Sequence, residues 1–139
     1  MRLDYTVSLR DFKQQVFFVR LEISAQRARD VRLKVGVFEH PLFGIENIMI
    51  SHGRGAEPID LVEKGFTFTL DPVDPIIITY KVITPFKDCM GSDRECDVVY
   101  PFSNDNEVFF GTGLLATLEP LEELETEMII SVDVSNMPL

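Results

Sequence analysis

The sequence predicts an all-β fold, an antiparallel β-sandwich of about seven to nine strands. Apolar and polar residues alternate at period two along most apolar stretches, as in strands that bury one face in a core and expose the other. Turn-forming residues interrupt these stretches at intervals of about 8 to 12 residues, which is the spacing of a sandwich. The clearest example is the pair of β-rich runs at 66–70 and 76–83. The linking segment 71–75 contains two prolines, which disfavour a helix there.

The first part of the chain predicts three strands. The strand expected over 3–9 is followed by a turn at 10–14 and a second strand over 17–24, so that the two form an opening hairpin. A third strand is expected over 31–37, after a polar link. The residues expected on one face of each strand are Leu3, Tyr5, Val7, Leu9, Phe17, Val19, Leu21, Ile23, Val31, Leu33, Val35 and Val37.

Residues 76–83 are expected to form a central strand. The continuous run Ile76-Ile77-Ile78 suits a strand that is buried on more than one side. In the preceding strand, Phe66, Phe68 and Leu70 share one face. Before these strands, we expect a short apolar piece at 45–50 between turns at 39–44 and 51–55, and a strand edge at 59–62. After them, we expect strand pieces at 98–100 and 108–110 around a turn at 103–106, and then an acidic helical turn or solvated loop at 119–127. The last expected strand carries Met128, Ile130, Val132 and Val134 at alternate positions.

The composition narrows the class of protein. With 139 residues, 45% of them hydrophobic and 26% charged, the chain has the size and composition of one globular domain. Its formal net charge of −10 disfavours a nucleic-acid partner, because binding a phosphate backbone requires clustered Lys and Arg. No apolar run approaches the roughly 20 residues that span a bilayer, so we expect no membrane partner. The first residues lack a signal peptide's apolar segment. The compartment stays open, with the cytoplasm slightly favoured.

The cysteines and histidines give no strong chemical signature. A disulfide between Cys89 and Cys96 is sterically compatible with their spacing, but free thiols are favoured in a chain of two cysteines without a secretion signal. His40 and His52, with Glu39, Glu46 and Asn47 as further donors, allow a two-histidine, one-carboxylate metal site. Their spacing matches no compact metalloprotease motif, and we favour solvent-exposed histidines in turns. We therefore expect no catalytic residue and no cofactor in this chain.

The interaction surface that the sequence suggests lies in a turn at one end of the sandwich. Its candidate residues are Phe38, His40, Pro41, Phe43 and Gly44. Loops at a sandwich end are common binding sites because a rigid scaffold positions them. Apolar residues on both sides of one strand, as at Phe17-Phe18, also suggest that a second face meets a core or a neighbouring domain.

The order of several segments resembles the N-terminal β-domain of the glycyl aminopeptidase-like gluzincin metallopeptidases. The similar segments are 3–7, 17–23, 66–68, 78–82, 106–110 and 129–134. The stretch Phe38 to Ile45 keeps the Pro, Gly and aromatic residues of that family's turn after the third strand but lacks its Trp and its Pro-Gly pair. The family's zinc-binding His-Glu-x-x-His segment is absent from the sequence, so no catalytic residue is carried over.

The resemblance implies that residues 1–139 are a single domain excised from the N-terminal part of a longer chain, itself a zinc aminopeptidase. In this hypothesis the domain is not an enzyme; it packs on a downstream catalytic domain in the same polypeptide and shapes its substrate cleft. The alternative is a free-standing module that binds a peptide, glycan or protein through end loops, including 89–96. A small metalloenzyme using His40 and His52 is a third, weaker hypothesis.

Overall fold

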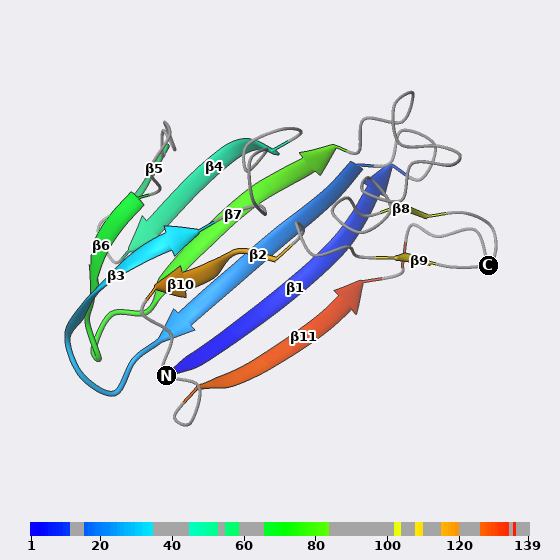
Figure 1. The fold of residues 1–139 in the computed structure, drawn as a ribbon. Helices are drawn as coiled ribbons and strands as arrows, with labels where there is room; N and C mark the ends of the chain where they lie inside the picture. Colours follow the sequence, from blue (N-terminus) through cyan, green and yellow to red (C-terminus); the bar gives the residue numbers. More distant parts are fainter. Residues whose placement is uncertain are drawn as a thin grey trace.

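A computed structural model describes residues 1–11, 16–34, 45–52, 55–58, 66–83, 102–103, 108–109, 115–119, 126–133 and 135, and the structural statements below concern these residues. They form eleven strands, and none of them lies in a helix (Figure 1). The predicted all-β class is therefore confirmed. The two larger sheets hold nine of the strands, which agrees with the predicted number.

The larger sheet has six strands in the order β11-β1-β2-β7-β4-β5. Their bounds are β1 Arg2–Asp11, β2 Val16–Ser24, β4 Ile45–His52, β5 Gly55–Pro58, β7 Ile76–Ile83 and β11 Glu127–Asp133. The opening hairpin forms as predicted, with Leu3 opposite Ile23 and Leu9 opposite Phe17. The strand β7 lies between β2 and β4, so the prediction that residues 76–83 form a central strand is confirmed.

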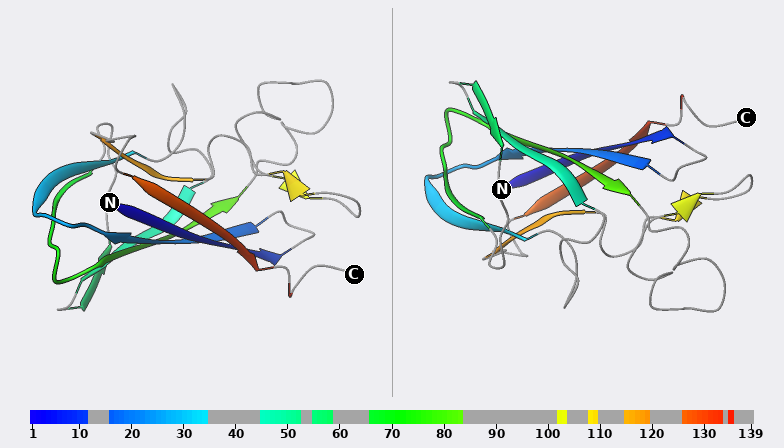
Figure 2. Two further views of the ribbon diagram at one scale, coloured as in Figure 1. Left: turned by 90° about the horizontal axis from the view of Figure 1, so that it is seen from below. Right: turned by 90° about the horizontal axis from the view of Figure 1, so that it is seen from above.

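The second layer is a three-stranded sheet in the order β10-β3-β6. Its strands are β3 Arg29–Lys34, β6 Phe66–Leu70 and β10 Thr117–Glu119, and a separate pair consists of β8 Phe102–Ser103 and β9 Val108–Phe109. The views from below and above show the two layers facing each other (Figure 2). This two-layer arrangement is the sandwich that the sequence predicts.

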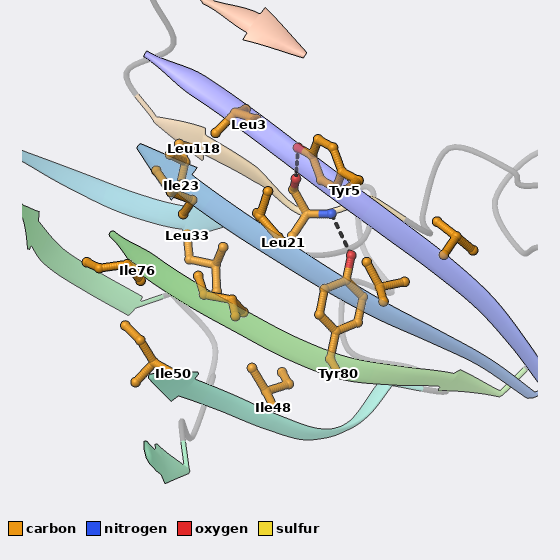
Figure 3. Packing of buried hydrophobic residues seen from close by; sticks show 14 of the residues in the cluster. Leu3, Tyr5, Leu21, Ile23, Leu33, Ile48, Ile50, Ile76, Tyr80 and Leu118 are labelled. Atoms are coloured by element: carbon orange, nitrogen blue, oxygen red, sulfur yellow. Dashed lines mark hydrogen bonds between the residues drawn. The ribbon is translucent and has the colours of Figure 1, made fainter. Parts of the chain in front are cut away.

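The core lies between the two layers and follows the alternation of the sequence. Along β2 and β7, every second side chain is buried and the residues between them are half-buried. The residues of the core are Leu3, Tyr5, Val7, Leu9, Phe17, Val19, Leu21, Ile23, Val31, Leu33, Ile48, Ile50, Leu70, Ile76, Ile78, Tyr80, Val82, Ala116 and Leu118 (Figure 3). The expected faces of the first two strands, with Val31 and Leu33 of the third, are thus confirmed.

The structure corrects the sequence analysis in several places. The sheet is not purely antiparallel, because β11 pairs with β1 in parallel. Residues 117–119 form β10, where no strand was expected. Three residues of the turn expected over 51–55 lie in strands instead, since β4 continues to His52 and β5 begins at Gly55, opposite it. Likewise, Ser103 is part of β8 rather than of a turn. Finally, β7 buries one face only, and Ile77 on its other face is half-buried.

One irregularity interrupts the register of the strand β4. The register between β4 and β7 shifts between Glu46 and Met49, and Asn47 has a φ of 54°. An asparagine tolerates this left-handed backbone better than most residues, because its side chain is short and polar.

The expected strand segments at 35–37, 59–62 and 98–100 lie outside the described residues.

Candidate functional site

The interaction surface suggested by the sequence stays a prediction. Its residues Phe38, His40, Pro41, Phe43 and Gly44 lie outside the described part of the chain, as do Cys89 and Cys96. The same holds for His40 and Glu39 of the two-histidine metal site. Within the described residues, no group of three or more His, Cys, Asp or Glu side chains is placed to hold a metal ion. The described residues also contain no helix that is long and apolar enough to cross a membrane.

The most unusual polar feature of the described structure is a pair of tyrosines in the core. The Tyr5 hydroxyl donates a hydrogen bond to the Ala116 carbonyl oxygen at 2.6 Å, and the Ala116 N–H donates one to the Tyr80 hydroxyl oxygen at 2.8 Å (Figure 3). Tyr5 comes from β1 and Tyr80 from β7, while Ala116 directly precedes β10. Two tyrosine side chains of the large sheet therefore bind the carbonyl and the N–H of Ala116, the residue next to a strand of the small sheet.

Burial makes these hydroxyl groups poor acids. Removal from water raises the pKa of Tyr5 to about 12, and it also raises the pKa of Tyr80, against the opposing effect of the hydrogen bond from Ala116. Both side chains have no exposed surface. A catalytic acid or base must reach its substrate and have a pKa near the working pH. The tyrosine pair meets neither condition, so its role is to join the two layers.

The exposed feature that distinguishes the described surface is an apolar stripe on β11. We call Met128, Ile130 and Val132 the β11 stripe; these residues are 46%, 47% and 44% exposed. They lie opposite Leu3, Tyr5 and Val7 of β1, whose side chains are buried in the core. The stripe is therefore a continuation of the core-facing side of the large sheet, beyond the area where that side is buried.

The sequence predicted the alternation of these residues along a last strand, in a fold whose strands each bury one face. The structure places them on the core-facing side as expected but leaves them almost half exposed, which the local pattern does not indicate. The signal that distinguishes them is the pairing order: among the described residues, β11 stands at the edge of the sheet and has a neighbouring strand on one side only.

Acidic residues lie at both ends of β11. Glu127 and Asp133 are exposed and alternate with the stripe, so their side chains lie on the outer face of the sheet. At the first end, the Glu127 N–H donates a hydrogen bond to the Met1 carbonyl oxygen at 2.9 Å. At the other end, a carboxylate oxygen of Asp133 accepts one from the Ser135 N–H at 3.0 Å. These bonds fix both ends of the edge strand.

Comparisons with known proteins support the fold. No protein-family model matches the chain, and no curated protein matches it. A crystal structure of an aminopeptidase N family protein from Idiomarina loihiensis is similar, with a TM-score of 0.60 and 17% sequence identity. The likeness covers 94% of this chain but 22% of that one, so the chain spans about a fifth of the similar protein's length. At this identity the similarity is one of fold: an all-β domain like a part of an aminopeptidase N family protein.

Proposed function

We propose that this chain is a non-catalytic β-domain of an aminopeptidase-like protein, and that it packs on a catalytic domain lying outside these 139 residues and shapes its substrate cleft. One observation carries the proposal: the fold similarity covers 94% of this chain while matching about a fifth of an aminopeptidase N family protein. A domain that occupies a fixed part of a larger enzyme has this pattern of coverage.

The chemistry of the described residues agrees with a supporting role. The buried polar groups of the tyrosine pair are engaged with Ala116, and the described acidic and histidine residues form no metal-binding cluster. The whole sequence contains no His-Glu-x-x-His segment to bind zinc. Catalysis by the parent protein would therefore depend on residues of another domain.

The proposal is tested by assaying the purified chain with aminoacyl p-nitroanilides, with and without added Zn²⁺. We expect no release of p-nitroaniline above the rate in buffer. Hydrolytic activity that elutes with the monomer in size-exclusion chromatography, and that is lost in the double variant His40→Ala, His52→Ala, would contradict the proposal. It would support a small metalloenzyme instead.

The alternative of a free-standing binding module is separated by the open reading frame that encodes the chain. Several hundred further codons that include a zinc-binding motif are expected after Leu139 under our proposal. A stop codon directly after Leu139 would favour the module, which binds a peptide, glycan or protein through its end loops.

A further inference from the structure

We propose that the outer edge of β11 binds an extended segment of a separate polypeptide, which adds a strand to the large sheet. The segment would carry apolar residues opposite the β11 stripe and basic residues opposite Glu127 and Asp133. This inference goes beyond the proposed function and does not depend on it, because it rests only on the residues of β11 and on its place in the sheet.

The first argument is the pairing of the sheet. Among the described residues, β11 pairs with β1 on one side and with no strand on the other. An edge strand presents a row of backbone N–H and C=O groups that can pair with a further strand. The seven residues of β11 give an edge long enough for a peptide of similar length. The backbone therefore offers the hydrogen-bonding part of a strand-binding site.

The second argument is the uncovered stripe. A strand added beside β11 places every second side chain on the core-facing side, next to Met128, Ile130 and Val132. Apolar side chains at those positions would remove stripe surface from water, which favours binding. Natural sheets commonly protect an edge with charges or a covering segment. Here the core-facing side of the edge strand carries apolar residues at three successive alternate positions, 128, 130 and 132.

The third argument concerns which strand fits. A second copy of β11, paired antiparallel about Ile130, would place Glu127 opposite Asp133 twice, and like charges directly opposite each other are destabilising. Each copy also carries a net charge of −10. Basic residues at those two positions would instead be attracted to the acidic ends of β11. The charges thus disfavour a second copy and select a partner strand with basic ends.

The probe for this site is the capped peptide Lys-Val-Thr-Val-Thr-Val-Lys, which fits β11 in either direction because its sequence is symmetric. The matched control is Glu-Val-Thr-Val-Thr-Val-Glu. Binding of each fluorescent peptide to the full chain is measured by anisotropy, and the protected amides are located by hydrogen exchange. We expect the lysine peptide to protect β11 and to bind roughly tenfold more tightly than the glutamate peptide, since two attractive pairs are exchanged for two repulsive ones.

Three variants of exposed residues localise the effect. Ile130→Asp should weaken binding of the lysine peptide at least about tenfold, whereas Val73→Asp, at a residue that is 88% exposed in another part of the chain, should leave it unchanged. The double variant Glu127→Gln, Asp133→Asn should remove the preference between the two peptides. The proposal is overturned if neither peptide binds, if both bind the parent chain equally, if Ile130→Asp binds as the parent does, or if sedimentation shows a dimer that Ile130→Asp disrupts.

Discussion

At the scale of single residues, the contacts of Tyr5 and Tyr80 with Ala116 tie the two layers together. The Tyr5 hydroxyl and its acceptor are separated by 111 positions in the sequence, so this contact joins segments that are distant along the chain. The sequence predicted that Tyr5 faces inward. It could not predict the partner of the hydroxyl, because the pattern of one strand says nothing about which distant carbonyl it meets.

Removing the Tyr5 hydroxyl should destabilise the fold more than removing an exposed hydroxyl. In Tyr5→Phe the buried Ala116 carbonyl loses the hydrogen bond from Tyr5, which we expect to cost about 1–3 kcal/mol in the free energy of unfolding. The control is Thr69→Val, because the Thr69 hydroxyl donates an exposed hydrogen bond of the same 2.6 Å length to Asp30. Water can replace that exposed bond, so the control should cost less than about 1 kcal/mol. Urea denaturation measures both; equal losses would contradict the expected stabilising effect of the buried Tyr5 hydrogen bond.

The same tyrosines predict a loss of stability at alkaline pH. Their folded pKa values are raised above the ordinary value of 10.0, so the stabilisation from keeping them neutral is complete below pH 10 and is lost as the pH rises toward the folded values. For Tyr5 this window runs from 10.0 to about 12, with a slope of about 1.4 kcal/mol per pH unit. Other groups also titrate there, so the parent chain is compared with Tyr5→Phe. From about pH 9 to about pH 11 the variant should lose roughly 1.4 kcal/mol less than the parent, and an identical loss would refute the linkage.

At the scale of elements, the two faces of β7 differ in burial. Ile78 is completely buried and lies opposite Leu21 of β2 and Ile50 of β4. Its neighbour Ile77 is half-buried on the other face, opposite Glu22 and Ser51. The sequence suggested that the continuous isoleucine run reflects burial on both sides of the strand, but only the face of Ile78 is fully buried. Ile77 and Ile78 therefore form a matched pair for comparing the two faces by mutation.

Replacing the two isoleucines should distinguish these faces. Ile78→Ala is expected to reduce the free energy of unfolding by about 2–5 kcal/mol, because it removes a large side chain from the core. Ile77→Ala should cost less than half as much, since its site stays in contact with water and polar neighbours. Phe68→Ala should also cost less than Ile78→Ala, because Phe68 is only partly buried on β6. Chemical denaturation compares them, and a larger loss for Ile77→Ala would mean that the faces are reversed.

The elements that the sequence predicts well are those with long alternating patterns. The strands β6 and β7 match the expected ranges, and β1 and β2 extend them by one or two residues. The strand β10 was missed because its three residues include a single buried side chain, Leu118, which is too short a pattern to detect. The direction of β11 was missed for a different reason. Alternation looks the same in a parallel and an antiparallel strand, so it does not report the neighbour's direction.

At the scale of the whole molecule, the first and last described long strands lie side by side. The pairing of β11 with β1 makes the edge of the large sheet depend on residues from both ends of the chain (Figure 1). The same pairing creates the candidate site, because it positions the β11 stripe beside the core without burying it. This part of the site could not be predicted from the sequence, since exposure at an edge depends on the order of the strands and on the extent of the second layer.

The parallel register of β1 and β11 supports both the fold and the proposed strand-binding site, because a shift by one residue would move the stripe to the other face of the sheet. Nuclear Overhauser effects between the backbone protons of the two strands measure it directly. The expected contacts join the neighbourhoods of Leu3 and Met128, of Tyr5 and Ile130, and of Val7 and Val132. Contacts in the antiparallel order, or a register that places Ile129 beside Tyr5, would contradict the account.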